Sequence, residues 1–246
     1  MHRFFVSDGQ IADGVITIDG EDVNHIRNVL RLRAGDDFEA ADEAGEVFTC
    51  RILEVSESSV RAQVLFSEMS GAELPNEITL YMGLPKFDKM ELVIQKAVEL
   101  GASRVVPVRT RRTVVKLDEK KAGAKVERWQ SIAEAAAKQS KRAFVPEIGT
   151  VCDFSKALKK AKDAGARIVF PYECAEGIGQ TRKVLRSIRP GEQVAVFIGP
   201  EGGFDPEEVK LAEANGAEVV TLGRRILRTE TAAIATLSIL AYVLEQ

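Results

Sequence analysis

The sequence predicts an α/β protein in which a small β-rich domain precedes a sheet of alternating strands and helices. Residues 1–70 contain short runs of β-prone residues separated by Gly and Asp turns, a pattern typical of a small barrel or sandwich. After residue 77, apolar strands alternate with helical patterns, as in an open α/β sheet with connecting helices. Residues 71–77 contain Gly, Pro and Asn and are expected to be a linker, so the second domain would span residues 78–246.

The first domain is expected to contain five strands and one helix. The helix is predicted over residues 21–32, where apolar residues from Val23 to Leu30 recur at helical spacing. Turn sequences such as SDGQ, AGDD and EAGE lie between the strands. The expected strands are residues 4–6, 15–18, 38–41, 47–55 and 60–66.

The second domain is expected to alternate between strands and helices. A helix is predicted around residues 87–98, where apolar residues repeat every three or four positions, and Gly101 follows as its stop signal. The strands are apolar runs of the kind that a parallel sheet buries on both faces. They are expected at residues 78–82, 104–108, 168–172, 194–198 and 219–222, and further helices at residues 122–140, 154–164, 205–215 and 229–245.

The composition indicates a soluble globular protein, since 45% of the 246 residues are hydrophobic and 29% are charged. The longest apolar run, residues 232–244, is interrupted by Thr236 and Ser238 and is too short to span a bilayer. No signal peptide is expected. The three cysteines are widely spaced and form neither a metal-binding pattern nor a disulfide framework. A cytoplasmic location is therefore expected, and no metal.

The charges are distributed unevenly along the chain. The net charge is −3, but residues 1–70 carry 6 Lys/Arg against 14 Asp/Glu, whereas residues 84–146 carry 15 Lys/Arg against 7 Asp/Glu. A basic segment inside an acidic protein suggests a local anionic partner. The alternative, that these cations only solvate helix faces, stays open on charge alone.

A glycine-rich segment, IGPEGGF at residues 198–204, follows one of the expected strands; it is called the glycine loop below. Asp205 is a good N-cap for the next helix, Pro206 suits its first position, and Glu208 completes a capping box. The loop therefore joins the carboxyl end of a strand to a helix, which is where ligands bind in open α/β sheets. It lacks the Lys-Ser/Thr of a Walker motif and the spacing of a dinucleotide fingerprint.

A second strand-to-helix segment, LGRRILR at residues 222–228, is called the arginine loop. Gly223 opens it, three arginines line it, and Thr229 is expected to cap the apolar helix that follows. A helix that is apolar all round must be buried in the core or against another subunit. If the two loops meet, they form a pocket of backbone groups that suits an adenine-bearing ligand without a charged phosphate. A tight turn without a ligand remains the alternative for the glycine loop.

These motifs closely resemble the late motifs of RsmE-type RNA methyltransferases, within the SPOUT superfamily. The resemblance spans nearly the whole chain, and its motifs are long and ordered. It is carried by IGPEGGF (198–204), LGRRILRTETA (222–232), GLPKFDKMELVIQKAVELGASRVVPV (83–108), RTRR (109–112), EAAAKQSKR (134–142), HRFFV (2–6) and HIRNVLRLRAGD (25–36).

The resemblance implies a fold and an activity. The first domain would be a PUA-like β-barrel that binds RNA, and the second a SPOUT methyltransferase domain whose last segment is threaded into a trefoil knot, which the periodicity does not predict. The cofactor would be S-adenosylmethionine, and the protein would act as a homodimer. The reaction would be methylation of N3 of one uridine, uracil 1498 of 16S rRNA in the small ribosomal subunit.

The resemblance also implies where the cofactor binds. Methyl transfer from a sulfonium requires position and electrostatics from the protein, and glycines would let the main chain touch the cofactor. Ile226 and Leu227 would add apolar contact, or pack in the core. The expected cofactor-binding residues are Phe170, Pro171, Tyr172, Ile198, Gly199, Pro200, Gly202, Gly203, Leu222, Gly223, Ile226, Leu227, Thr229 and Thr231.

Four residues are expected to act in catalysis. The acceptor N3 carries a proton, so a base must lie within hydrogen-bond reach of it. Glu201 and Glu230 are the candidate bases, although each is also a candidate for orienting an arginine, and that role suits Glu201 better. Arg228 or Arg142 would stabilise a developing uracil anion.

The RNA contacts are expected from the charge map, because phosphate contact is the most direct use of surface Lys and Arg. A single-stranded or looped target would let the uracil enter the pocket. Gln139 is expected to read a base edge or to pack. The expected RNA-binding residues are Arg3, Arg27, Arg31, Arg33, Lys86, Lys89, Arg109, Arg111, Arg112, Lys138, Gln139 and Lys141.

Two other functions remain open on the sequence. One is a non-catalytic RNA-binding protein that docks on ribosomal RNA through the barrel and the basic segment. The other is a nucleotide-binding α/β enzyme acting on a small substrate, which the missing phosphate-loop lysine and the basic segment disfavour.

Overall fold

A computed structural model describes residues 1–42, 44–115, 117–175 and 177–245. Within these ranges the chain forms two compact units. The first unit comprises Met1–Glu73 together with Ala137–Val145, and the second comprises Leu74–Ala136 and the residues from Pro146 onwards. Among the residues described, none of the helices combines the length and apolar character that crossing a bilayer requires.

The first unit is built on one sheet with the strand order β1-β4-β5-β6-β3-β2. The β1–β4 pair is parallel and the other pairs are antiparallel. The strands confirm the expected runs, with short β2 as an addition. Their bounds are β1 Arg3–Phe5, β2 Ile11–Ala12, β3 Val15–Asp19, β4 Asp37–Ala41, β5 Glu46–Val55 and β6 Ser59–Met69, and a 3-10 turn η1 spans Asp8–Gln10.

The helix expected over residues 21–32 is only partly right. A single α-helical turn, α1 (Glu21–Asn24), passes into a π-helical turn, η2 (His25–Val29). Val23 and Ile26 are buried, as the expected helical spacing requires, whereas Val29 in the wider turn is 61% exposed. The side chains of α1 and η2 join a core that contains Phe4 and Phe38.

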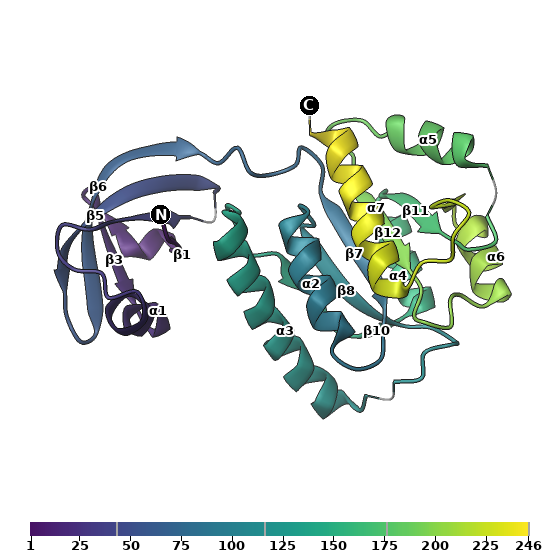
Figure 1. Cartoon of the computed structure of the whole chain (residues 1–246), viewed down its shortest axis with the longest axis horizontal. Helices are drawn as coiled ribbons and strands as arrows, with labels where there is room; N and C mark the ends of the chain where they lie inside the picture. Colours follow the sequence, from purple (N-terminus) through teal and green to yellow (C-terminus); the bar gives the residue numbers. More distant parts are fainter. Residues whose placement is uncertain (43, 116, 176, 246) are drawn as a thin grey trace. The chain divides into compact units, whose positions relative to one another are not determined.

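The second unit is built on a parallel sheet with the order β10-β8-β7-β12-β11-β13, and β9 pairs with β8 (Figure 1). The five expected strands are confirmed, while β9 and β10 were not expected. The bounds are β7 Ile78–Gly83, β8 Arg104–Arg109, β9 Glu147–Ile148, β10 Cys152–Asp153, β11 Arg167–Pro171, β12 Val194–Ile198 and β13 Glu218–Val220.

Helices connect these strands. The last helix, α7, packs on α2 and against β12, which places its start beside the glycine loop (Figure 1). The expected helices are confirmed within a few residues, and α5 is an addition. The bounds are α2 Lys89–Glu99, α3 Glu119–Ser140, α4 Phe154–Asp163, α5 Ile178–Arg186, α6 Pro206–Ala214 and α7 Thr229–Leu244.

An aromatic cluster fills the core on one face of the second sheet. Tyr81 stacks on Phe197 with ring centroids 4.4 Å apart, and Phe170 packs against Phe204 at 4.3 Å. Phe204 ends the glycine loop, so this cluster anchors the loop from beneath. Phe170, expected to contact the cofactor, is fully buried in the cluster.

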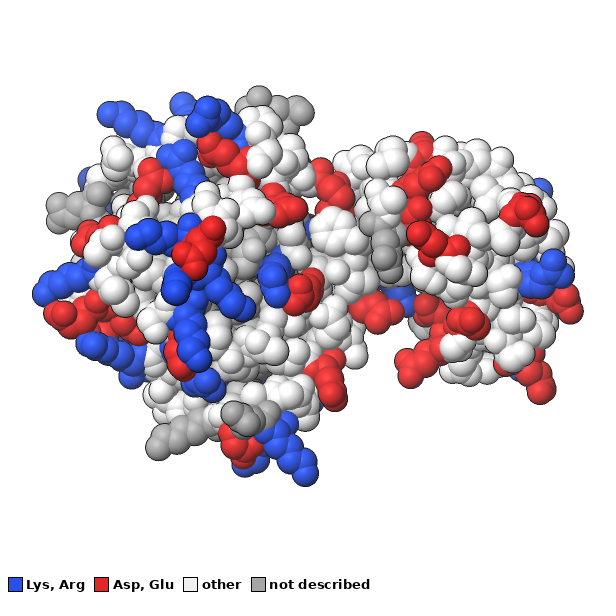
Figure 2. Space-filling view, turned by 180° about the vertical axis from the view of Figure 1, so that it is seen from behind, with Lys and Arg blue, Asp and Glu red and all other residues white. Residues whose placement is uncertain are grey.

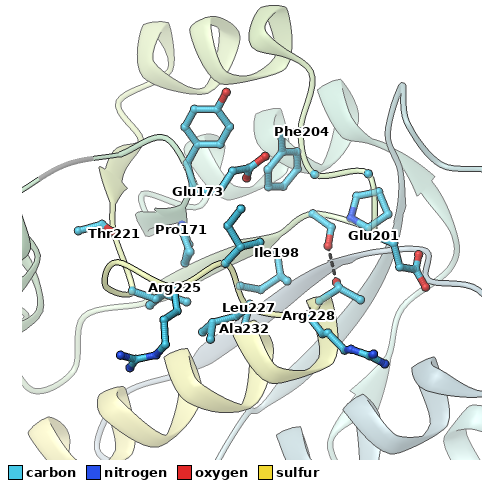
Figure 3. A pocket seen from close by; sticks show the side chains of 18 of the residues that line it. Pro171, Glu173, Ile198, Glu201, Phe204, Thr221, Arg225, Leu227, Arg228 and Ala232 are labelled. Atoms are coloured by element: carbon cyan, nitrogen blue, oxygen red, sulfur yellow. Dashed lines mark hydrogen bonds between the residues drawn. The ribbon is translucent and has the colours of Figure 1, made fainter.

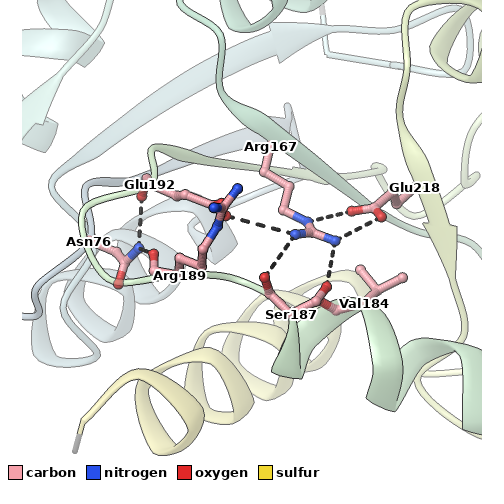
Figure 4. Close-up of polar contacts among 7 residues, drawn as sticks. All are labelled: Asn76, Arg167, Val184, Ser187, Arg189, Glu192 and Glu218. Carbon is pink, nitrogen blue, oxygen red and sulfur yellow. Dashed lines mark hydrogen bonds and ion pairs between the residues drawn. The ribbon is translucent and has the colours of Figure 1, made fainter.

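A polar network joins the amino ends of the strands, opposite the carboxyl ends from which the glycine and arginine loops emerge (Figure 4). Arg167 at the start of β11 pairs with Glu218 of β13 at 2.6 Å and with Glu192 at 3.8 Å. Asn76 donates to the carbonyl oxygens of Arg189 and Glu192, at 2.7 and 2.8 Å. This network holds the chain just before β7. It lies at the amino ends of the strands, whereas the site lies at their carboxyl ends.

Candidate active site

A pocket of about 510 Å³ lies at the carboxyl ends of β11, β12 and β13, where the glycine and arginine loops meet (Figure 3). Backbone and apolar groups make up most of its wall. The lining residues are Lys89, Pro171, Tyr172, Glu173, Ile198, Gly199, Pro200, Glu201, Gly202, Gly203, Phe204, Thr221, Leu222, Gly223, Arg225, Ile226, Leu227, Arg228, Thr229 and Ala232.

Close backbone contact fixes the glycine loop against the end of β7. A Cβ atom on Gly83 would lie 2.6 Å from the backbone nitrogen of Pro200, so only glycine fits there. On the other side, the Thr229 hydroxyl donates to the Gly199 carbonyl oxygen. The expectation that Thr229 caps α7 is therefore wrong: Arg228 is the N-cap residue, and the Thr229 side chain ties α7 to the glycine loop.

The run 109–112 holds the far end of the glycine loop. Arg112 Nη1 donates to the Gly202 carbonyl oxygen at 2.9 Å, and Arg111 pairs with Asp205 at 3.0 Å. The capping box of α6 is confirmed, with the Asp205 side chain accepting from Glu207 N. Glu208 of the same box also accepts from the backbone nitrogen of Arg111 at 2.9 Å. Two arginines expected to bind RNA thus have a structural role beside the pocket.

The arginine loop has fewer contacts of its own. The Thr181 hydroxyl donates to the Thr221 carbonyl oxygen at 3.0 Å, just before the loop. The Thr221 hydroxyl in turn donates to the Gly223 carbonyl oxygen at 3.2 Å. Beyond that point the side chain of Ile226 is 86% exposed although it lines the pocket. Glu201 and Arg228 lie on one side of the pocket and Arg225 on the other (Figure 3).

A lysine and two carboxylates form a charged cluster at the mouth of the glycine loop. Lys89 Nζ lies 3.2 Å from Glu201 Oε1 and 3.2 Å from Glu230 Oε2. The backbone nitrogen of Lys86 donates to Glu201 Oε1 at 3.0 Å. Glu201 was expected to orient an arginine, but its partner in the structure is a lysine.

The cluster is charged at neutral pH. Two opposing effects act on the pKa of the Glu201 carboxyl. Partial burial acts to raise this pKa, whereas hydrogen bonds from backbone N–H groups and the Lys89 ammonium act to lower it. The lowering effects are larger together, so the pKa lies below its ordinary value of 4.5. Hydrogen bonding to Glu201, with Glu230 nearby, raises the pKa of Lys89 above its ordinary value. Both groups therefore keep their charge across the neutral range.

The structure brings most of the expected cofactor-binding residues to the one pocket. Phe170 lies in the core and Thr231 is exposed on α7, and neither lines the pocket. Lys89, Glu173, Phe204, Thr221, Arg225 and Ala232 line it without having been expected there. Of these, Lys89 carried a charge signal, while Glu173 follows the expected triplet 170–172 directly.

The four candidate catalytic residues do not all lie at the pocket. Glu201 and Arg228 line the pocket, and Glu230 reaches it through Lys89. Arg142 lies in the first unit, where its side chain is buried, pairs with Glu73 at 2.6 Å and stacks over Phe144.

The expected RNA-binding residues also differ in their surroundings. In the first unit Arg3 is buried against Glu39 and Lys138 pairs with Asp22, whereas four others are exposed: Arg27, Arg31, Arg33 and Gln139. Lys141 is exposed and 3.3 Å from Glu39. In the second unit Lys86 is exposed and Arg109 pairs with Asp153. Figure 2 shows Asp and Glu prominent on the first unit, and many Lys and Arg on the second.

A family model described as an RNA methyltransferase domain matches residues 72–241, and a second, described as an RNA methyltransferase PUA domain, matches residues 18–65. The fold is thus that of an RNA methyltransferase. A relative from Bacillus subtilis (strain 168), "Ribosomal RNA small subunit methyltransferase E", is 38% identical and aligns with 100% of this chain and 98% of its own. The chain belongs to the ribosomal RNA small subunit methyltransferase E family.

Solved structures agree with this assignment. The Neisseria gonorrhoeae ribosomal RNA small subunit methyltransferase E, bound to S-adenosyl methionine, is 32% identical over 97% of this chain and 96% of its own, with a TM-score of 0.83. A putative methyltransferase from Legionella pneumophila, in complex with the same cofactor, is 30% identical over 98% and 96%, with a TM-score of 0.84. The expected order, a PUA-like domain followed by an α/β methyltransferase domain, is confirmed; the knot stays a prediction.

Proposed function

We propose that this protein transfers a methyl group from S-adenosylmethionine to N3 of one uridine, uracil 1498, in the 16S rRNA of the small ribosomal subunit. The observation that carries the proposal is the pocket between the glycine and arginine loops, in a chain of the ribosomal RNA small subunit methyltransferase E family. The pocket suits the cofactor, and exposed Lys and Arg side chains suit the RNA.

The pocket fits the cofactor in size and chemistry. Gly203 has a φ of +66°, which favours glycine at this turn of the cavity wall, and a Cβ atom there would displace the end of the Glu173 side chain. The wall offers apolar contact from Ile198, Leu222 and Leu227, and carboxylates that favour a cationic sulfonium. S-adenosylmethionine supplies an electrophilic methyl group when it is bound, and the chain's own contribution is to hold and orient the reactants.

Glu201 is the better placed of the two candidate bases. It lines the pocket, whereas Glu230 lies behind Lys89. A base must first be within reach of the proton that it removes, and its acidity matters second. We therefore assign the proton of N3 to the Glu201 carboxylate. Arg228, on the same side of the pocket, would stabilise the negative charge that remains on the ring.

The RNA would bind through exposed cations. Arg27, Arg31 and Arg33 form one candidate surface of the first unit, and Lys86 lies just before α2 in the second. Arg111 and Arg112 contact RNA in this proposal in addition to holding the glycine loop. Replacing Arg31 and Arg33 with Gln would lower the salt slope of RNA binding by about 2 if both contact phosphates.

The protein would act as a cytoplasmic homodimer. Tyr242 of α7 is 84% exposed and Ile226 is similarly exposed, and such side chains suit burial against a second copy of the chain. Residues 1–70 would serve as the RNA-binding PUA-like domain, residues 71–77 as the linker and residues 78–246 as the knotted catalytic domain. The proposed methyl transfer uses no metal ion, because the sulfonium cofactor itself supplies the electrophile.

Mass spectrometry of 16S rRNA tests the proposal. RNA from cells that lack this protein should carry unmodified uracil 1498, and restoring the protein should restore N3-methyluridine there. A catalytically silent RNA-binding protein would leave the modification unchanged. It would also give no heat on titration with S-adenosylmethionine.

A further inference from the structure

Lys89 presents an ammonium group to the pocket from the first turn of α2. A cation is unfavourable at a helix N-terminus, because the positive end of the helix dipole lies there. Glu201 and Glu230 offset this cost by placing one carboxylate oxygen each 3.2 Å from Nζ. The ammonium is therefore held in the pocket wall, where its side chain is 27% exposed.

The two carboxylates hold this lysine from different segments. Glu201 belongs to the glycine loop and is itself held by the backbone nitrogen of Lys86. Glu230 lies in the first turn of α7, and its Oε2 atom is fully buried, accepts no hydrogen bond from the described residues and lies 3.2 Å from Lys89 Nζ. Burying a carboxylate oxygen is costly unless a cation compensates it. Glu230 thus fixes the position of Lys89.

An ammonium group has three N–H donors, and two carboxylate oxygens can take at most two of them, which leaves at least one donor for an acceptor that enters the pocket. In uracil, N3 lies between two carbonyl groups. When N3 loses its proton, the negative charge spreads onto both carbonyl oxygens. A fixed cation beside one of these oxygens lowers the energy of the anion, and does so most effectively where water is excluded.

We infer that Lys89 is a catalytic residue whose ammonium binds a carbonyl oxygen of the target uracil and stabilises the N3 anion, with Glu230 as its positioning residue. The inference rests on the proposed function. In the balanced step, the N3 proton passes to the Glu201 carboxylate, and the N3 electron pair forms the bond to the methyl carbon. The carbon–sulfur bond breaks with its electron pair remaining on sulfur. Glu201 then releases its proton to water.

The test compares Lys89→Met and Lys89→Arg with the wild type under single-turnover conditions, with S-adenosylmethionine saturating and the enzyme in saturating excess over the RNA. The substrate is reconstituted small subunits whose 16S rRNA contains uridine or 5-fluorouridine. Because fluorine makes N3 more acidic, its anion needs less stabilisation. Lys89→Met should lower the rate constant about 100-fold on uridine, and this deficit should shrink about tenfold on 5-fluorouridine. Lys89→Arg should recover most of the rate, because it keeps the charge.

Lys96→Met is the matched control, because it removes an ion pair with Glu99 from the same helix and should leave the rate unchanged. If Lys89→Met fails to fold, the double variant with Glu230→Gln removes the uncompensated carboxylate and serves instead. An equal deficit on both RNAs, or an undiminished rate, would overturn the role of Lys89 while the wild type remains active. A wild type that methylates neither RNA would overturn the proposed function and this inference with it.

Discussion

The two loops that form the pocket follow strands in the same way, but they are held very differently. The glycine loop is contacted by Gly83 of β7, by Arg112, by Thr229 and by the backbone of Lys86. The arginine loop is anchored at its start by Thr221, and its Ile226 side chain is 86% exposed.

This difference indicates what each loop needs. The chain's own contacts fix the glycine loop, so that wall of the pocket is ready before any ligand arrives. An apolar side chain as exposed as Ile226 gains stability only when something covers it. A bound cofactor or a second copy of the chain would therefore complete the arginine loop.

Gly83→Val should have the largest effect, because it would force β7 and the glycine loop apart. We expect the free energy of unfolding to fall by about 3 kcal/mol, measured by urea denaturation, and the binding of S-adenosylmethionine to be lost. Gly179→Val is the matched control, since nothing lies within 4 Å of a Cβ atom at Gly179. Equal stability of the two variants would contradict the close contact between β7 and the loop.

Ile226→Ser should affect binding but not folding. The exposed side chain contributes little to the unliganded protein, so the free energy of unfolding should change by less than about 0.5 kcal/mol. Losing its apolar contact with the cofactor should weaken binding about tenfold, measured by titration calorimetry. Unchanged affinity with a weakened dimer would assign Ile226 to the subunit interface alone.

In contrast to Ile226→Ser, Arg112→Met should lower the stability of the fold, by less than Gly83→Val does. It removes one hydrogen bond to the glycine loop, so we expect a loss of about 1 kcal/mol in the free energy of unfolding. Arg189→Met removes an exposed ion pair elsewhere in the second unit and should cost less than about 0.5 kcal/mol. If the two variants cost the same, the Arg112 contact is not a support of the loop.

The smallest effect is a pH dependence that arises from Glu201 of the glycine loop and from Asp205, the N-cap of α6. The pKa of Glu201 is lowered by the contacts described above, and the pKa of Asp205 is lowered chiefly by the Glu207 backbone and also by Arg111. A carboxyl group whose pKa is lowered in the folded state stabilises the fold when the pH is above its ordinary pKa, which is 4.5 for Glu201 and 3.8 for Asp205. This stabilisation is lost as the pH falls through the pKa of the folded state. Urea titrations of Glu201→Gln should show a flatter loss of stability in acid than the wild type.

The sequence predicted the two loops because their signals are local. Glycines, the Asp205 capping box and an apolar run before each loop lie within a few residues of one another. The strands were predictable for the same reason. In contrast, the π-helical turn at His25–Val29 could not be expected from periodicity, because Val23 and Ile26 are spaced as they would be on the buried face of an ordinary α-helix.

Side-chain roles were harder to predict where distant segments meet. Lys89 and Arg142 both carried only a charge signal in the sequence. Packing of the β7–α2 segment on the glycine loop brings Lys89 to the pocket, while Glu73 draws Arg142 into the first unit's interior. The charge pattern alone could not distinguish the pocket position of Lys89 from the buried position of Arg142.

A crystal structure of the complex with S-adenosylmethionine tests the central claim most directly. The adenosyl group should lie between residues 198–204 and 222–227 of the second unit, with Ile226 covered. An adenosyl group bound elsewhere on the chain, with the two loops left without ligand, would contradict the account.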